Sequence, residues 1–159
     1  MKANNALSWK ILILLLLNWL AISGFAQKGI PFITNFTLPV SMSTDNYQVV
    51  QGDNNMIYVL NQNGIFSFDG YNWEHLPVGG QPMAITYLDK LFVGGDKVLG
   101  YFKKNLNGIN VFVPIEQNRT ELFYLFHHFN NILYAAGVDG IYKIRRVEPY
   151  RVENYYTER

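Results

Sequence analysis

The sequence predicts an all-β protein in which a four-stranded antiparallel unit occurs about three times. Two observations lead to this fold class. Beyond residue 26, apolar residues recur with a period of two in short runs separated by Asn, Asp and Gly, as in antiparallel strands joined by tight turns. In addition, three segments of the chain can be aligned with one another. No stretch beyond residue 26 has the 3.6-residue period of an amphipathic helix.

The aligned segments share an aromatic position, which is occupied by Tyr58, Phe92 and Tyr134. The copies are therefore separated by 34 and then 42 residues. Four-stranded units with a period of about 40 residues are typical of β-propeller blades. We therefore predict an open arc of about three four-stranded propeller blades, a partial β-propeller. The blades are expected at about residues 47–78, 83–115 and 121–159.

Each blade is expected to contain four strands. In the first blade they span about residues 47–51, 56–61, 65–68 and 73–78. In the second they span about residues 83–88, 91–94, 99–103 and 110–115. In the third they span about residues 122–129, 132–136, 141–145 and 150–155. Val59 and its neighbour Tyr58 are both apolar but point to opposite faces, so we expect the inner strands to be buried on both faces.

Turn residues precede the third strand of each blade. The pairs at this place are Asn63-Gly64, Asp96-Lys97 and Asp139-Gly140. Asn-Gly and Asp-Gly favour the positive φ angles of two-residue hairpin loops, so we expect these pairs to form the turns. Two glycine pairs, Gly79-Gly80 and Gly94-Gly95, are also interpreted as turns.

The N-terminal segment has the order of features found in a secretory signal peptide. Lys2 and Lys10 come first, and an apolar run follows at residues 11–20. Small residues come next, with Gly24 and Ala26 placed three and one residues before a cleavage point. This order predicts export from the cytoplasm.

We expect residues 1–26 to be the signal peptide and residues 27–46 to form an N-terminal strand and lead-in to the first blade. The mature protein would then be periplasmic or secreted. The alternative is a membrane anchor at residues 11–26, although these 16 residues are fewer than the roughly 20 that span a bilayer.

Composition excludes several classes of function. The whole chain carries 13 Lys+Arg and 12 Asp+Glu, a formal charge of +1. Without Lys2 and Lys10 of the predicted signal peptide, the formal net charge becomes −1. A near-neutral body without a basic stripe is not expected to bind nucleic acid directly. With no cysteine, the chain has no disulfide, no thiolate nucleophile and no Cys-ligated metal.

The residues that could support catalysis or metal binding are scattered. His127 and His128 are neighbours on a predicted strand, so their side chains point to opposite faces and cannot share a metal. Asp69 is expected to bond the local backbone of a turn, and nothing in the pattern pairs Glu116 with Glu121 as acid and base. We therefore expect a non-enzymatic protein with no cofactor, no catalytic residue and no metal ligand.

Aromatic residues are abundant, with 11 Tyr, 11 Phe and 3 Trp. Their placement inside strands favours packing between blades. The alternative is a carbohydrate-binding surface, because tyrosine and tryptophan offer a flat apolar face with a polar edge. We expect packing to account for most of them.

Two stretches resemble the start of the two-component regulator propeller family. Residues 28–36 read Lys-Gly-Ile-Pro-Phe-Ile-Thr-Asn-Phe directly after the predicted signal peptide. The family pattern then matches Asn63, Gly64, Asp69, Gly70 and Trp73. Its first pair is matched again by Asp139 and Gly140. The resemblance covers about residues 28–144, and the Asp-Gly and Trp of the pattern are absent in the second and third blades.

The resemblance implies a role as well as a fold. Members of this family are periplasmic sensor propellers, usually of seven blades, that precede a membrane helix and a signalling output domain. By resemblance, the chain is the N-terminal part of such a sensor, with a glycan fragment or another small periplasmic ligand as its partner. The alternative is a free-standing secreted carbohydrate-binding or adhesion module.

Three blades are fewer than the four to eight that close a propeller ring. We therefore expect the first and third blades each to present an unpaired, aromatic-rich face. A strand at residues 30–36 is expected to be only weakly docked. The isolated chain is expected to self-associate through such open edges or to aggregate.

Overall fold

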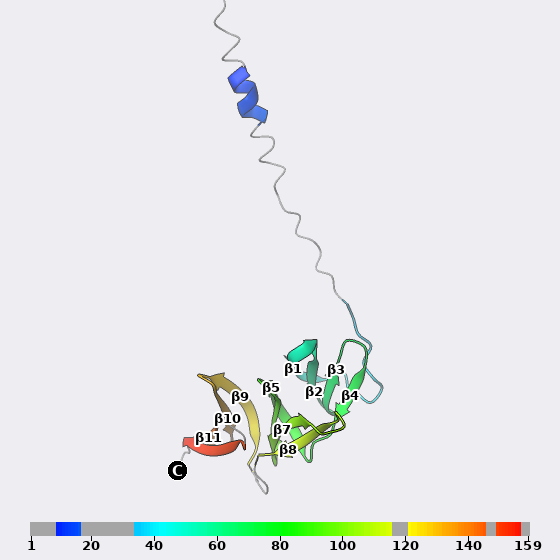
Figure 1. Ribbon diagram of the computed structural model, residues 1–159, viewed down its shortest axis with the longest axis vertical. Helices are drawn as coiled ribbons and strands as arrows, with labels where there is room; N and C mark the ends of the chain where they lie inside the picture. Colours follow the sequence, from blue (N-terminus) through cyan, green and yellow to red (C-terminus); the bar gives the residue numbers. More distant parts are fainter. Residues whose placement is uncertain (1–8, 17–33, 116–120, 146–148, 157–159) are drawn as a thin grey trace, which may run out of the picture. The chain divides into compact units, whose positions relative to one another are not determined.

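The computed structural model describes residues 9–16, 34–115, 121–145 and 149–156 (Figure 1). The chain divides into two compact units, Met1–Phe36 and Thr37–Arg159. In the first unit, residues 9–16 form a helix within the predicted signal peptide, whose cleavage point falls outside the described residues. In the described part of the chain, no helix has the length and hydropathy that a membrane span requires.

The second unit consists of three antiparallel sheets of four strands each (Figure 1). The first sheet contains β1 (Asn46–Gln51), β2 (Ile57–Asn61), β3 (Gly64–Phe68) and β4 (Trp73–Leu76), with a 3-10 turn η1 (Asp53–Asn55) after β1. The second contains β5 (Gln81–Tyr87), β6 (Leu91–Asp96), β7 (Val98–Lys104) and β8 (Asn110–Pro114). The third contains β9 (Phe123–Phe129), β10 (Ile132–Gly137), β11 (Gly140–Arg145) and β12 (Arg151–Tyr156).

Within each sheet the strands pair in chain order, so each sheet is a meander. The predicted all-β fold of three consecutive four-stranded units is confirmed, and the strand bounds differ from the predicted ones by at most two residues. The agreement follows from the short polar breaks between runs of period two, which define strands and turns together.

The second sheet is buried on both faces, as the adjacent apolar residues of its inner strands predict. On one face, Val93 of β6 belongs to a buried cluster with Leu60 and Ile65 of the first sheet. On the other face, the neighbouring Phe92 packs with Phe123 of the third sheet. Because adjacent residues on a strand point to opposite faces, one apolar strand contributes to two separate cores.

The first strand of each sheet lies next to the neighbouring sheet. β5 contacts both β1 and β9. The Gln48 side-chain oxygen accepts a hydrogen bond of 2.9 Å from the backbone N–H of Ile85, which joins β1 to β5. A single β-bridge between Asp96 and Leu122 joins the second sheet to the entry of β9. The three sheets therefore pack around their first strands.

Two of the hairpins turn one residue earlier than predicted. Asn61 pairs with Gly64, so the loop contains Gln62 and Asn63 rather than Asn63 and Gly64. Gly140 likewise begins β11 directly after the loop. The positive φ angles, 125° and 149°, belong to Gly64 and Gly140, and the preceding Asn63 and its counterpart in the third sheet do not have one. Glycine is used here because no Cβ opposes these angles.

The outer face of the first sheet is covered in part, which contradicts the expectation that it is open. Met42 packs in a buried cluster with Val59 and Phe66, and residues 37–45, which form no strand, supply this cover. The buried side chain of Asn61 fastens the segment by donating to the Ser43 carbonyl at 2.7 Å and accepting from the Ser43 N–H at 3.1 Å. Of the expected strand at residues 30–36, only residues 34–36 are described, and they form no strand.

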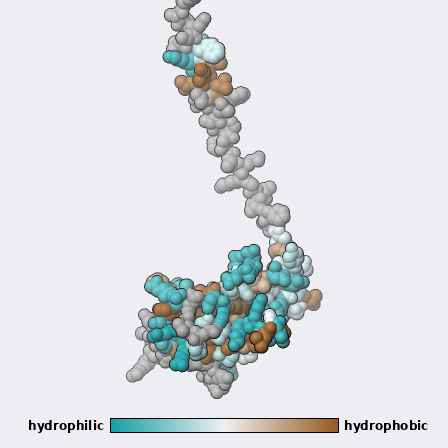
Figure 2. Space-filling view, in the orientation of Figure 1, coloured by the Kyte–Doolittle hydropathy of each residue, from teal (hydrophilic) through white to brown (hydrophobic). Residues whose placement is uncertain are grey.

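The outer face of the third sheet is apolar and exposed. Leu125, Phe129 and Ile141 are 55%, 58% and 39% exposed. A shallow cavity of about 240 Å³ lies on this face between Leu125, Ile141 and Tyr134. In the space-filling view, hydrophobic residues are interspersed with hydrophilic ones on the visible side of the sheets (Figure 2). The third sheet therefore has the open face that the sequence predicts.

Candidate functional site

The connections between strands gather at two ends of the sheets. One end carries the β2–β3, β6–β7 and β10–β11 hairpins and the links from each sheet to the next, and we name it the hairpin end. The opposite end carries the other turns within the sheets, including η1 and residues 69–72. Among the described residues, a cavity lies between the first and second sheets at each of these ends.

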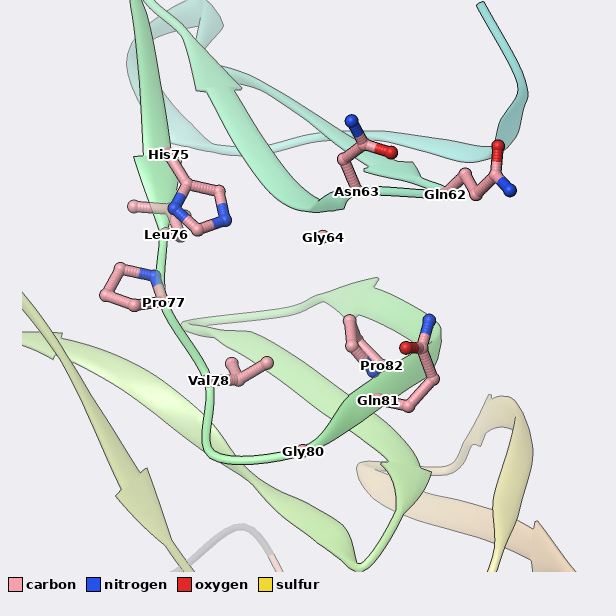
Figure 3. A pocket seen from close by; sticks show the side chains of 10 residues that line it. All are labelled: Gln62, Asn63, Gly64, His75, Leu76, Pro77, Val78, Gly80, Gln81 and Pro82. Atoms are coloured by element: carbon pink, nitrogen blue, oxygen red, sulfur yellow. The ribbon is translucent and has the colours of Figure 1, made fainter. Parts of the chain in front are cut away.

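The hairpin-end cavity has a volume of about 230 Å³ and lies between the β2–β3 hairpin and the link that enters β5 (Figure 3). Gln62 and Asn63 line it from the hairpin, and Gln81 and Pro82 line it from the start of β5. The His75 ring lies at its edge, with its centroid 5.1 Å from that of the buried Phe66 ring. Except for His75, the lining polar side chains cannot be charged.

The cavity at the opposite end is larger, about 360 Å³, and is lined by Tyr58 and Tyr87 together with Lys90, Lys103 and Lys104. The two tyrosine rings stack, with 5.7 Å between their centroids. Burial is the main cause that raises the pKa of Tyr58 above its ordinary value, and the neighbouring Tyr87 raises it further. Burial also raises the pKa of Tyr87. Both phenols therefore remain protonated near neutral pH.

The corresponding place between the second and third sheets is filled by side chains. The Tyr150 hydroxyl donates a 2.8 Å hydrogen bond to Asp89, and the Tyr101 and Tyr150 rings meet edge to face at 4.7 Å. The Lys90 ammonium lies 4.8 Å from the centroid of the Tyr101 ring, within reach of a cation–π contact. The Tyr101–Tyr150 contact and the Tyr58–Tyr87 stack occupy corresponding places. The similarity indicates that aromatic residues at the opposite end mainly hold neighbouring sheets together.

Each first strand carries a β-bulge at the same register. The pairing skips Tyr47 in β1, Met83 in β5 and Tyr124 in β9. These three side chains are 62%, 45% and 49% exposed, and all lie where the strands begin, at the hairpin end. Sequence reasoning missed them because the repeat was aligned on the second and third strands. Their equivalence becomes visible only when each first strand is aligned through its register with the second.

The predicted role of Asp69 in its turn is confirmed. One carboxylate oxygen accepts hydrogen bonds from the backbone N–H groups of Asn72, at 2.7 Å, and Tyr71, at 2.8 Å. These bonds hold the pKa of Asp69 below its ordinary value. The next residue, Gly70, has a φ angle of +102°, which a Cβ would oppose.

Asp69 should titrate at a lower pH than an ordinary aspartate, because protonation removes the acceptor of both backbone bonds. Its contribution to stability should be complete above the ordinary aspartate pKa and lost as the pH falls through the lowered one. Carbon-detected NMR titration of the Asp69 carboxyl measures this. An Asp69 titration that coincides with that of an aspartate in an unfolded peptide would contradict the turn geometry.

Trp73 begins β4 and stacks on Phe68, with 4.6 Å between ring centroids and 27° between the planes. Its side chain is half-buried rather than fully buried. We therefore expect Trp73→Ala to lower the free energy of unfolding by about 2–3 kcal/mol, below the 3–5 kcal/mol typical of a fully buried ring. Urea denaturation measures this, with the exposed Tyr71→Ala in the same turn as the control. Equal midpoints for the two variants would contradict a structural role.

The remaining candidates do not form a site together. His127 pairs with Tyr134 and His128 with Leu133, so the two imidazoles belong to neighbouring positions of β9 that point to opposite faces. Glu121 lies before β9, and Glu116 is outside the described residues. Within the described ranges, no group of three or more His, Asp or Glu side chains is placed to hold a metal ion.

The described side chains therefore include a cavity at each end of the first two sheets, a further cavity on the outer face of the third sheet, and one repeated set of bulged residues. Such an arrangement can bind a ligand through shape, aromatic contact and hydrogen bonds. Compared with protein-family models, with curated proteins and with solved structures, the chain matches none of them.

Proposed function

We propose that this chain is the N-terminal part of a non-enzymatic β-propeller sensor, which is exported and binds a small ligand for a two-component-type signalling receptor. One observation carries the proposal. Three consecutive four-stranded sheets pack face to face, and β5 lies in contact with β1 and β9. Blades of a propeller pack in this way, with their first strands nearest to the axis.

The outer face of the third sheet supports the proposal. Its exposed Leu125, Phe129 and Ile141 occupy the face on which a further blade of a propeller would pack. Contiguous exposed apolar surface commonly marks a place where another element or protein binds. The resemblance of Asn63, Gly64 and the following turn to the two-component regulator propeller pattern adds the sensor role.

Two measurements test the proposal. Protein recovered from the periplasm of a Gram-negative host should begin within a few residues of Gln27 by mass spectrometry, and a cytosolic product that retains Met1 would contradict export. A thermal-shift screen of that protein against periplasmic small molecules and glycan fragments should find a stabilising ligand. Saturation at 100 times Kd adds about 2.7 kcal/mol to the free energy of unfolding. A screen without any stabilising compound would overturn the sensor role.

The open third face leads to a further expected result. The mature protein should self-associate with increasing concentration, because exposed apolar side chains on this face lose contact with water when two copies meet. Leu125→Lys should shift sedimentation velocity profiles toward the monomer, whereas Leu106→Lys, at a fully exposed position outside the strands, should not. A wild-type protein that stays monomeric at all concentrations would contradict this expectation.

A further inference from the structure

We propose that the cavity between the first and second sheets, at the end opposite the hairpin end, binds a small aromatic carboxylate with one or two rings. This inference rests on the proposed ligand-sensing function and identifies a site and a ligand class for it. It follows from the way in which the equivalent space between the second and third sheets is filled, from the aromatic walls of the cavity and from the charges of its lining.

Between the second and third sheets, the side chain of Tyr150 fills this space. Its ring packs edge to face on Phe92 and Tyr101, with 5.2 Å and 4.7 Å between centroids. Its hydroxyl donates a 2.8 Å hydrogen bond to Asp89, and the Lys90 ammonium lies 5.2 Å from the centroid of its ring. The repeat therefore accommodates an aromatic ring between neighbouring sheets at this end, with charged groups beside it.

The pairing register identifies the residue of the second sheet that is equivalent to Tyr150. In the second sheet, the ladders lead from the shared aromatic position to β7 and then to β8, through Phe92, Tyr101 and Val113. In the third sheet, they lead to β11 and then to β12, through Tyr134, Lys143 and Glu153. Tyr150 lies three residues before the last of these, and Asn110 lies three residues before Val113. Asn110 is therefore the equivalent residue.

The substitution of asparagine for tyrosine explains the cavity. Asn110 has no ring to place between the first and second sheets, and it lines the cavity of about 360 Å³ that lies there. Its side-chain N–H donates a 3.3 Å hydrogen bond to the Glu74 carboxylate of the first sheet. A ligand that contains an aromatic ring can occupy the space that Tyr150 occupies in the next interface.

The walls of the cavity suit such a ring. Tyr58 and Tyr87 line it, and their half-buried rings are nearly parallel, with 13° between the planes. The buried Leu91 and Phe102 line it as well. Aromatic rings pack favourably on one another in offset and edge-to-face arrangements, which this set of side chains allows. A pocket of this volume accommodates a small organic ligand of one or two rings.

The lining contains more ammonium groups than carboxylates. Its charged residues are three lysines and one aspartate: Lys90, Lys103, Lys104 and Asp89. Asp89 and Lys90 contact Tyr150 in the next interface. Lys104 shares a strand face with Phe102, which packs toward the first sheet, and its side chain is exposed. Among the described residues, its ammonium belongs to no ion pair. Lys104 can therefore pair with a ligand carboxylate.

Two nearby carboxylates limit the negative charge of the ligand. Asp53 and Glu74 do not line the cavity, but after burial and the neighbouring Tyr87 they contribute to the raised pKa of Tyr58. Their charges would repel a ligand with several negative charges, such as a nucleotide. A single carboxylate on an aromatic ring agrees with both the lysine and the two acidic neighbours.

Isothermal titration calorimetry on the purified exported protein tests the ligand class. The probes are para-coumarate and naphthoate, which combine rings with a carboxylate, para-coumaramide, which keeps the ring without the charge, and hexanoate, which keeps the charge without a ring. We expect at least one of the two aromatic acids to bind with a Kd below about 1 mM. The amide and hexanoate should each bind about tenfold more weakly than that acid or not at all.

Three variants test the site with the acid that binds. Asn110→Tyr should fill the cavity as Tyr150 fills its own interface, and should weaken binding at least about tenfold, whereas Asn110→Ala leaves the space open and should still bind. Lys104→Met should weaken binding about tenfold. The matched control is Lys143→Met, at a strand position of the third sheet, and it should leave Kd unchanged.

Four results would overturn the inference. Equal affinity for para-coumarate and its amide would refute the charge pairing. Unchanged affinity in Asn110→Tyr, with the fold retained by circular dichroism, would place the site elsewhere, and the sensor function would stand. If Asn110→Tyr does not fold, Lys104→Met decides, and unchanged affinity in that variant refutes the site. If neither aromatic acid binds, the ligand class is wrong, and the thermal-shift screen separately decides whether the protein senses another ligand.

Discussion

Replacing Phe92 with alanine should lower the free energy of unfolding by about 3–5 kcal/mol. Phe92 is fully buried on β6, on the face that packs against the third sheet. Its ring lies 5.2 Å from that of Tyr150 and 5.9 Å from that of Tyr101, measured between centroids. The substitution removes this ring and leaves a cavity that the two sheets cannot close without separating from their neighbours. Urea denaturation followed by circular dichroism measures the loss.

Phe129→Ala is the matched control, because Phe129 is a strand phenylalanine that is 58% exposed. Under dilute, monomeric conditions its loss should be under about 1 kcal/mol. Equal losses for Phe92→Ala and Phe129→Ala would show that the second and third sheets do not share a core. That result would also remove the basis for interpreting the sheets as propeller blades.

Gly95→Ala should destabilise the protein by about 3 kcal/mol, at the upper end of the range for overpacking. Gly95 pairs with Pro82 across the β5–β6 ladder. A Cβ at this position would collide with the backbone carbonyl oxygen of Gln81 and come within 2.8 Å of the Cα of Pro82. Backbone atoms in a paired strand cannot move aside as a side chain can, so the ladder itself must distort. Thermal and urea unfolding both report this loss.

Gly79→Ala is the control for the same substitution in the same part of the chain. A Cβ on Gly79 meets no atom within 4 Å, and its φ angle is outside the region that disfavours alanine. The stability should be unchanged or rise by up to about 1 kcal/mol, because alanine restricts the unfolded chain. Unfolding of Gly95→Ala at the same midpoint as Gly79→Ala would contradict the close contact between β5 and β6 at Gly95.

Local sequence predicted the strands well because each strand and each turn depends on a few neighbouring residues. The short apolar run at Leu91, Phe92 and Val93 follows a polar break, as is typical of a strand buried on both faces, and β6 begins there. Asn130 and Asn131, which lie between two of the expected strands, both have positive φ angles, 46° and 63°, in the loop between β9 and β10. Asparagine tolerates these angles better than other non-glycine residues.

The interpretation from sequence was wrong where residues distant in the chain approach a glycine too closely for a side chain to fit. Gly94 and Gly95 were interpreted as a turn, but both lie within β6. Phe123 of the third sheet approaches Gly94 so closely that a Cβ there would lie 2.9 Å from the Cβ of Phe123. A glycine pair is a common turn signal, and the contact that explains it here comes from a residue 29 positions away in the chain.

The sequence by itself determined the all-β class, the three four-stranded units and the positions of their strands, because periodicity and turn residues act over a few residues. Only the tertiary structure decided that residues 37–45 cover the first sheet and that the third sheet stays open. It alone placed Tyr47, Met83 and Tyr124 at one register of neighbouring strands. These features depend on the packing of separate sheets and on the pairing register, which residues far apart in the chain decide together.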